Sequence, residues 1–178
     1  MKREQWQLWS AAIPKTRCEE WLNILKKEVL LQDATTFSKH DTTYRNTKIG
    51  WTDNPDIKNN LQAFLNEANR NVFNFDINYI PSIQFGEYGE GCLYEWHHDV
   101  DWESTKVYDR KLSIAVQLTD SSEYDGGDFE FRYLQKPSQF KEQGSVLVFP
   151  SYQEHRVTKI LSGTRHSLVC WAEGPRWR

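Results

Sequence analysis

The chain has few of the features that mark secreted, disulfide-bonded or membrane proteins. Its 178 residues include only three cysteines, Cys18, Cys92 and Cys170, whose odd number and wide spacing argue against a disulfide framework. The first ten residues, MKREQWQLWS, lack the apolar core of a secretory signal, and no apolar run approaches membrane-spanning length. We therefore expect reduced thiols, no membrane partner and a cytoplasmic location.

Net charge is also low. A formal charge of −3 and an isoelectric point near 6.0 provide no general field for nucleic acid, so we expect no nucleic-acid partner. Mean hydropathy is −0.76, which is low for a globular protein, but 14% of the residues are aromatic, including eight Trp. Disordered chains are short of aromatics, so we predict one compact domain over residues 1–178 with an aromatic-rich interior or cleft.

Two segments in the first 75 residues have helical spacing of apolar side chains, 16–29 and 54–72. The apolar stripes are most simply packing surfaces. After residue 75 the pattern changes to at least six short runs of period two or of continuous apolar residues, separated by turn signals. This predicts a mainly β protein in which residues 76–178 form a jelly roll, with helices from residues 1–75 packed on one sheet.

The run RKLSIAVQLT (110–119) can be interpreted face by face, because side chains alternate along a strand. The apolar face, which should pack on the helices, consists of Leu112, Ile114, Val116 and Leu118. The small and polar face consists of Ser113, Ala115, Gln117 and Thr119. A strand with such a second face suits the wall of a wet cavity better than a dry core.

The segment EWHHDVD contains a candidate metal-binding pair. On a strand, His97 and Asp99 point to the same side, whereas His98 faces away with Val100. We therefore predict that His97 and Asp99 chelate a metal and that His98 is a packing or surface histidine. His155, just past the apolar strand VLVFP, would complete a facial triad of two histidines and one carboxylate.

Such a triad leaves three coordination positions open and suits Fe(II) oxygenases, in which a cosubstrate and O2 must both bind. The formal charge of a ferrous centre with these ligands, about +1, favours an anionic chelating ligand. Downstream, Arg165, Ser167 and Trp171 alternate onto one strand face. Because a guanidinium binds a carboxylate bidentately, a metal plus this Arg–Ser pair fits a small dicarboxylate such as 2-oxoglutarate.

Three stretches carry a family resemblance: YGEGCLYEWHHD, RKLSIAVQLTDSSEYDGGDFEF and GSVLVFPSYQEHRVTKILSGTRHSLVCWAEGPRW. Over residues 80–178 the chain resembles the iron(II)/2-oxoglutarate-dependent dioxygenases, in particular the prolyl-4-hydroxylase-like branch of bacteria and phages. The resemblance implies a double-stranded β-helix with iron on His97, Asp99 and His155. It also implies that Arg165 binds the distal carboxylate of 2-oxoglutarate, with help from Ser167.

The same resemblance implies further contacts. Tyr88 matches a tyrosine that reaches the cosubstrate or the pocket mouth, and Gln117 matches a strand position that contacts 2-oxoglutarate, where relatives often have tyrosine. We add Trp171, Asp101 and Tyr94 as candidates for the substrate pocket. The segment 101–110 is a candidate mobile lid. His166 alternates away from Arg165 and should be exposed.

The resemblance implies hydroxylation of an unactivated C–H bond, with O2 consumed, succinate and CO2 released, and ascorbate as a candidate reductant. Retention of Asp99 favours hydroxylation over halogenation, since halogenating relatives leave that ligand position free. A peptidyl proline in a protein or peptide is the expected acceptor, and a free amino acid or other small metabolite is the alternative. A non-enzymatic metal-binding β-sandwich would have no use for Arg165 and Ser167. The acidic isoelectric point weighs against nucleic-acid demethylation.

Overall fold

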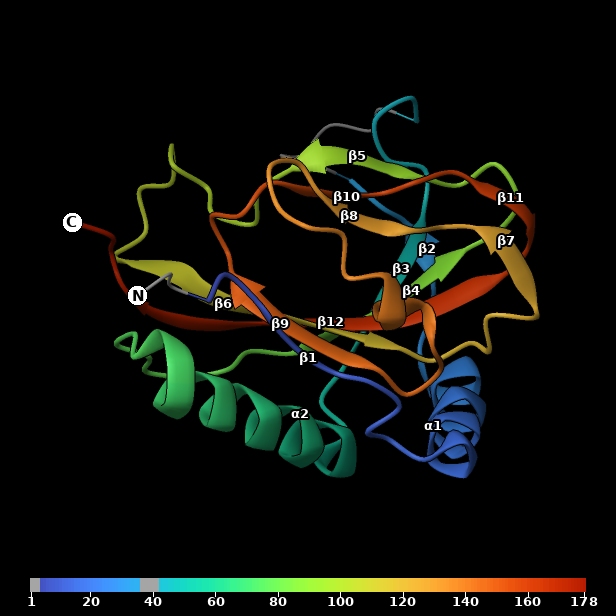
Figure 1. Ribbon diagram of the computed structural model, residues 1–178, viewed down its shortest axis with the longest axis horizontal. Helices are drawn as coiled ribbons and strands as arrows, with labels where there is room; N and C mark the ends of the chain where they lie inside the picture. Colours follow the sequence, from blue (N-terminus) through green and yellow to red (C-terminus); the bar gives the residue numbers. More distant parts are fainter. Residues whose placement is uncertain (1–3, 36–41) are drawn as a thin grey trace.

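The computed structural model describes residues 4–35 and 42–178, which form two helices beneath a layered β structure (Figure 1). The helices are α1 (Lys15–Glu28) and α2 (Pro55–Ala68), followed by a π-helical turn at Asn69–Phe73 and, later, a 3₁₀ turn at Ser138–Lys141. The strands are β1 (Gln7–Trp9), β2 (Gln32–Asp33), β3 (Lys48–Thr52), β4 (Ile83–Tyr88), β5 (Tyr94–His97), β6 (Tyr108–Gln117), β7 (Tyr124–Gly126), β8 (Phe129–Phe131), β9 (Val146–Pro150), β10 (His155–Val157), β11 (Ile160–Gly163) and β12 (Arg165–Pro175).

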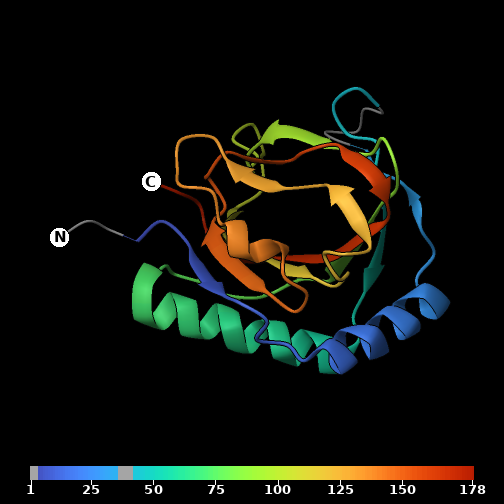
Figure 2. The ribbon, with the colours of Figure 1, turned by 45° about the vertical axis from the view of Figure 1, so that its right-hand side comes forward.

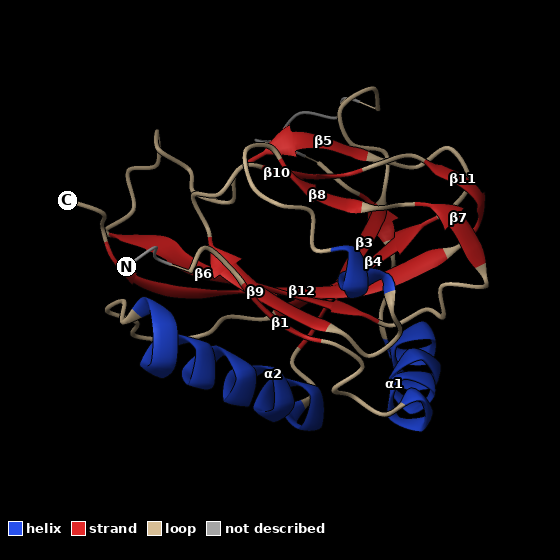
Figure 3. Cartoon of the chain, viewed as in Figure 1, coloured by secondary structure: helices blue, strands red, loops and turns tan. Residues whose placement is uncertain are grey.

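The strands form one large and two small antiparallel sheets (Figure 3). The large sheet has seven strands in the order β1-β9-β6-β12-β4-β3-β2. Above it lie the three-stranded sheet β5-β10-β8 and the two-stranded sheet β11-β7, and both helices cover the opposite face of the large sheet (Figure 2). This arrangement confirms the predicted mainly β jelly roll with helices packed on one sheet.

The first 75 residues contribute more than the two expected helices. Strand β1 pairs with β9 at one edge of the large sheet, and β3 pairs with β4 near the other. The N-terminal segment is therefore part of the sheet as well as its helical cover. Over the described ranges of the chain, no helix is long and apolar enough to cross a membrane.

Helix α2 begins where the sequence NPD supplies its start signals. The Asn54 side-chain oxygen accepts hydrogen bonds from the backbone N–H groups of Asp56 (3.1 Å) and Ile57 (3.3 Å), and Pro55 occupies the first turn. The buried face of the helix consists of Ile57, Leu61, Leu65 and Ala68. This face belongs to the same core cluster as the apolar face predicted for β6, Leu112, Ile114, Val116 and Leu118. The prediction for that face is confirmed.

Truncating Leu61 to alanine should lower the free energy of unfolding by about 2–5 kcal/mol, because the side chain is fully buried and the cavity cannot refill. The neighbouring Gln62 is exposed, and Gln62→Ala should change stability by less than about 0.5 kcal/mol. Urea denaturation of both variants measures the difference. Similar losses in the two variants would show that α2 does not pack as described.

His166 is buried, and the expectation that it is exposed was wrong. It is 5% exposed, stacks on Phe85 with ring centroids 5.7 Å apart, and its backbone N–H donates to Thr119 Oγ1 at 2.7 Å. Its Nε2 lies 3.2 Å from a carboxylate oxygen of Glu87. Burial lowers the pKa of His166, and the nearby Lys26 of α1 adds to that shift. Alternation correctly turned His166 away from Arg165, but that face of the sheet is covered by helices.

Candidate active site

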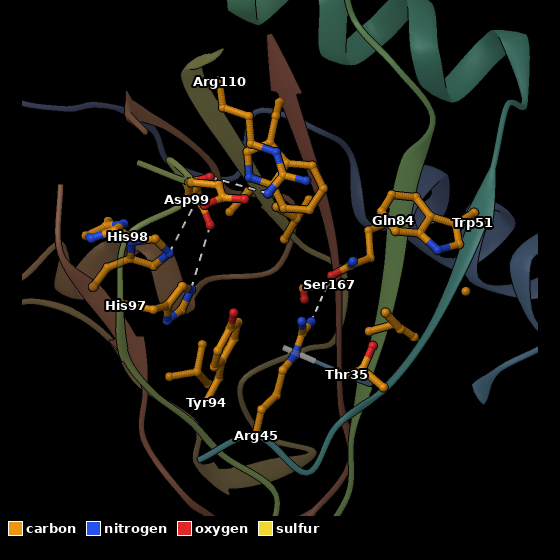
Figure 4. Close-up of a pocket in the computed structure, with 18 of the residues that line it drawn as sticks. Thr35, Arg45, Trp51, Gln84, Tyr94, His97, His98, Asp99, Arg110 and Ser167 are labelled. Carbon is orange, nitrogen blue, oxygen red and sulfur yellow. Dashed lines mark hydrogen bonds and ion pairs between the residues drawn. The ribbon is translucent and has the colours of Figure 1, made fainter. Parts of the chain in front are cut away.

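A cavity of about 660 Å³ lies between the large sheet and the small sheet that contains β5 and β10 (Figure 4). Nine of the predicted site residues line it, namely Tyr88, Tyr94, His97, Asp99, Asp101, His155, Arg165, Ser167 and Trp171. The inner face of β12 supplies Arg165, Ser167, Val169 and Trp171, as alternation predicts. Residues from distant parts of the chain therefore converge on one space.

The three predicted metal ligands lie together at one side of the cavity. Strand pairing places His155 directly opposite His97, and the two ring centroids are 4.2 Å apart. Asp99 follows β5, where its backbone N–H donates to the carbonyl of Ser151 at 2.9 Å. One potential ligand atom from each of His97, Asp99 and His155 lies within 4.8 Å of the others.

Backbone contacts determine which nitrogen of each imidazole faces the cluster. His97 Nδ1 lies 2.7 Å from the carbonyl oxygen of Glu95, and His155 Nδ1 lies 2.9 Å from that of Gln153. A carbonyl oxygen can only accept, so each Nδ1 carries the proton and each Nε2 keeps its lone pair. Both Nε2 atoms are 3.8 Å from carboxylate oxygens of Asp99. The lone pairs thus point where a metal ion would sit.

The charge states also suit a metal. Burial, reinforced by His155, lowers the pKa of His97 to about 3, so its imidazole is neutral at pH 7. Burial alone would raise the pKa of Asp99, but the two imidazoles, Arg110 and a hydrogen bond from Ser113 outweigh it and lower that pKa to about 2. Two neutral imidazoles and one charged carboxylate are the donor set of non-haem Fe(II) oxygenases, so the residues present fit a ferrous ion.

Tyr94 lies against the cluster because β5 contains one extra residue. His155 and Val157 of β10 are two positions apart, but their partners on β5, His97 and Tyr94, are three positions apart. This bulge turns Tyr94 to the side of His97, and the rings stack with centroids 3.5 Å apart. His98 also borders the cavity, but its Nδ1 lies 2.8 Å from the carbonyl oxygen of Val100 and it is not one of the three convergent donors.

Arg165 lies at another part of the cavity and is 3% exposed. Its guanidinium sits over the ring of Tyr88, 5.2 Å from the centroid, and Nη1 donates to Ser167 Oγ at 3.4 Å. Over residues 4–35 and 42–178, no carboxylate forms an ion pair with it. A buried cation that lacks an anionic partner is available to bind one, and the sequence predicts a dicarboxylate for this position.

Gln117 contacts Arg165 instead of facing the cavity. Its Oε1 accepts from Arg165 Nε at 3.0 Å, while its Nε2 donates to the Tyr124 hydroxyl at 2.9 Å and to the Thr119 carbonyl at 3.2 Å. Among the described residues, those that line the main cavity do not include Gln117. The residue predicted to touch the cosubstrate thus orients the guanidinium from behind.

The cavity mouth is aromatic and cationic. Trp171 is buried beneath the guanidinium of Arg110, which lies 3.7 Å from its ring centroid, and Trp51 lies 6.2 Å from Trp171 between ring centroids. Asp101 borders the mouth, where its carboxylate accepts from the backbone N–H of Glu103 at 3.2 Å. The last three residues of the candidate lid over 101–110 belong to β6, which begins at Tyr108.

Two side chains and one contact of this site were not predicted from the sequence: Arg45, Arg110 and the hydrogen bond of the Ser113 hydroxyl. Ser113 lies on the cavity face of β6 as predicted, but its hydrogen bond to Asp99 has no sequence signal. Arg110 reaches the cavity because Lys111 is an extra residue in the pairing of β6 with β12. Arg45 stands in a segment interpreted as irregular, where the alternation of Arg45, Thr47 and Ile49 is the only available indication.

Replacing Ser113 with alanine should weaken metal affinity about 10–100-fold, since Ser113 Oγ donates to Asp99 Oδ2 at 2.6 Å and orients that carboxylate. Ser151→Ala is the matched control, because Ser151 Oγ contacts Ser113 Oγ at 2.9 Å and leaves the bond to Asp99 in place. Equilibrium dialysis with Fe(II) under anaerobic conditions measures both affinities. Equal affinity in the Ser113 variant and the unmodified protein would contradict the expectation.

Comparison with known proteins points in the same direction. The family model of the 2OG-Fe(II) oxygenase superfamily matches residues 83–173, just over half of the chain. A PKHD-type hydroxylase of Prochlorococcus marinus is 32% identical over 95 residues. That match covers 53% of this chain and 42% of the relative, so the matched region is less than half of the curated protein.

Solved structures of low sequence identity share the fold. The viral collagen prolyl hydroxylase of Paramecium bursaria Chlorella virus-1, in its 2OG complex, superposes with a TM-score of 0.75 at 16% identity, covering 96% of this chain and 97% of that one. A prolyl hydroxylase of Trichoplax adhaerens, in complex with a hypoxia inducible factor peptide fragment, has a TM-score of 0.74 at 15% identity, covering 94% and 83%. These likenesses confirm the predicted double-stranded β-helix.

Proposed function

Because the chain belongs to the 2OG-Fe(II) oxygenase superfamily, we propose that it is a dioxygenase that uses Fe(II), 2-oxoglutarate and O2 to hydroxylate an unactivated C–H bond. The observation that carries this proposal is one cavity bordered by both the His97–Asp99–His155 cluster and the buried Arg165, which has no carboxylate partner among the described residues. A metal of purely structural use would need no such arginine. The whole chain, residues 1–178, would act as one oxygenase domain, with residues 1–75 supporting the jelly roll.

Each group has a proposed part. His97, Asp99 and His155 would hold Fe(II), while Arg165 and Ser167 bind the distal carboxylate of 2-oxoglutarate and Gln117 keeps the guanidinium in place. Bound together, the metal, 2-oxoglutarate and O2 supply an oxidation strong enough to hydroxylate a C–H bond, with succinate and CO2 as products.

The surroundings of the cluster would protect this chemistry. The protein keeps His97 neutral by burial, which preserves its lone pair for the metal, and it keeps Asp99 charged. The rings of Tyr94 and Tyr88 and the side chain of Trp171 border the same cavity and limit access of water. Tyr88, under the guanidinium of Arg165, is positioned to contact the bound cosubstrate.

We propose a peptidyl proline as the acceptor, with a free amino acid or another small metabolite as the alternative. Two solved proteins of this fold are prolyl hydroxylases, and one of them is in complex with a peptide. Trp51 lines the cavity and Trp102 lies against the cavity-lining His98, and each is about half exposed, so both offer aromatic surface to a peptide. Three unpaired cysteines support a reducing location such as the cytoplasm.

Succinate release tests the chemistry, and peptide mass spectrometry tests the acceptor. The protein should convert 2-oxoglutarate to succinate in the presence of Fe(II) and air, with ascorbate tested as a reductant. A peptide library and an amino-acid panel should then reveal a one-oxygen mass gain that depends on 2-oxoglutarate. No succinate with any member of either panel, coupled or uncoupled, would favour a non-enzymatic metal-binding module.

A further inference from the structure

Arg45 is a second buried cation of the cavity, and the proposed chemistry does not use it. Its side chain belongs to the loop before β3, is 8% exposed, and reaches toward the middle of the cavity between Tyr94 and Gln84 (Figure 4). Within residues 4–35 and 42–178, no carboxylate forms an ion pair with it. Burying a guanidinium without an anionic partner costs free energy, so we expect this side chain to bind an anionic ligand.

Neutral groups hold Arg45 in one orientation. Its Nε donates to Thr47 Oγ1 at 3.1 Å, its Nη2 donates to Gln84 Oε1 at 3.0 Å, and its guanidinium lies 4.2 Å from the ring centroid of Tyr94. These contacts orient the planar fork and engage two of its N–H donors without neutralising its charge. The remaining donors are available for a planar, bidentate anion, and a carboxylate has that geometry.

The charges of the proposed complex leave Arg45 uncompensated. A ferrous ion, the two carboxylates of 2-oxoglutarate, Asp99 and Arg165 sum to zero formal charge, since an imidazole binds a metal in its neutral form. Among the described residues, four further acids border the cavity and none of them is paired with Arg45: Asp33, Asp101, Asp109 and Glu173. Three of these have hydrogen-bond partners of their own: Asp101 accepts from the backbone N–H of Glu103 at 3.2 Å, Asp109 accepts from the backbone N–H of Trp177 at 2.8 Å, and Glu173 accepts from the Tyr79 hydroxyl.

The position of Arg45 relates it to the acceptor. Tyr94 separates it from the cluster, because Tyr94 packs on Arg45 with one face and stacks on His97 at 3.5 Å. A carboxylate held by Arg45 would therefore be separated from the metal ligands by about the Tyr94 ring. We propose, on the basis of the oxygenase function above, that Arg45 binds a carboxylate of the acceptor. The acceptor is thus an acid whose hydroxylated C–H bond lies close to that carboxylate.

Paired acid and amide probes test this proposal, because each pair differs only in the anion. Free L-amino acids, including L-proline, are compared with their amides, which tests an α-carboxylate. The peptide Ac-Pro-Glu-NH2 is compared with Ac-Pro-Gln-NH2, which tests a side-chain carboxylate. Binding is measured by calorimetry on the protein loaded with Fe(II) and 2-oxoglutarate without air, so that no turnover occurs. At least one acid should bind about tenfold or more tightly than its amide.

The Arg45→Gln variant should abolish that preference while leaving the affinities for the amide probes and for 2-oxoglutarate unchanged. Arg110→Gln is the matched control, since it removes a cavity-lining guanidinium at the mouth, and it should keep the preference. Arg45→Lys retains the charge but loses the planar guanidinium. Its preference for acid over amide should lie between those of Arg45→Gln and the unmodified protein. A thermal melt of each variant checks folding, and the comparison of acid with amide in the unmodified protein does not depend on any variant.

The proposal is overturned by any one of these results: no acid is preferred over its amide in the unmodified protein, the preference survives Arg45→Gln, or the preference is lost in Arg110→Gln instead. Weaker binding of 2-oxoglutarate in Arg45→Gln would assign Arg45 to the cosubstrate and also reject it. Failure of the proposed function is seen separately, because the unmodified protein would then show no visible charge-transfer band with Fe(II) and 2-oxoglutarate under anaerobic conditions.

Discussion

Replacing His97 with alanine should abolish iron-dependent turnover of 2-oxoglutarate, whereas replacing the adjacent His98 should largely spare it. His97 Nε2 is one of three convergent donors, and its loss removes a ligand outright. The effect should exceed the roughly 100-fold that removing an outer hydrogen-bond partner of a metal ligand costs. The measurements are succinate formation at saturating 2-oxoglutarate and Fe(II) affinity by anaerobic dialysis.

His98→Ala is a stringent control because the two histidines are adjacent in sequence and both border the cavity. The His98 ring bonds within its own turn and lies 6.1 Å from Trp102 between centroids, so its loss should act on local packing. Equal losses of Fe(II) affinity in both variants would contradict the assignment of the ligands, and so would full activity of His97→Ala.

Replacing Arg165 with alanine should weaken 2-oxoglutarate binding by a factor between about 30 and several thousand, the usual cost of truncating one partner of a buried charge pair. Arg165 is the buried cation that Ser167 and Gln117 orient, and both of these partners are neutral, so neither can replace its charge in the variant. The anaerobic charge-transfer band, titrated with 2-oxoglutarate, reports this affinity directly. At low 2-oxoglutarate the band should be absent from the variant.

Arg165→Lys separates charge from geometry. Lysine keeps the positive charge but cannot form two parallel bonds to a carboxylate, so its affinity should lie between those of the unmodified protein and Arg165→Ala. Fe(II) affinity without 2-oxoglutarate should be the same in all three proteins. A band that survives in Arg165→Ala at low 2-oxoglutarate would count against the role of this residue.

The sequence predicted what regular strand geometry controls. Along β12 the pairing with β4 and β6 is uninterrupted from Arg165 to Ala172, so alternation placed Arg165, Ser167 and Trp171 on the cavity side. His155 was found because it follows an apolar strand, and its pairing with His97 then brings the ligands together. Where hydrogen bonding between strands is regular, period two gives the face of every side chain.

The sequence could not predict what depends on irregular pairing or on distant segments. Strict alternation would turn Tyr94 to the other face of β5 from His97, and would turn Arg110 to the helix side with Leu112. One extra residue in each strand reverses both orientations. The burial of His166 depends on how far the helices extend over the sheet. Arg45 reaches the cavity from a loop that precedes β3, and its neighbours Gln84 and Tyr94 come from other strands.

Strand β12 follows every other strand in the chain, yet it lies between β6 and β4 near the centre of the large sheet. On the ribosome, β4 and β6 would therefore emerge long before the strand that joins them. Until residues 165–175 are made, the inner edges of both strands lack their partner, and unpaired edges favour aggregation. A lower rate of expression should therefore raise the yield of folded protein, because fewer incomplete chains with unpaired edges are then present at the same time.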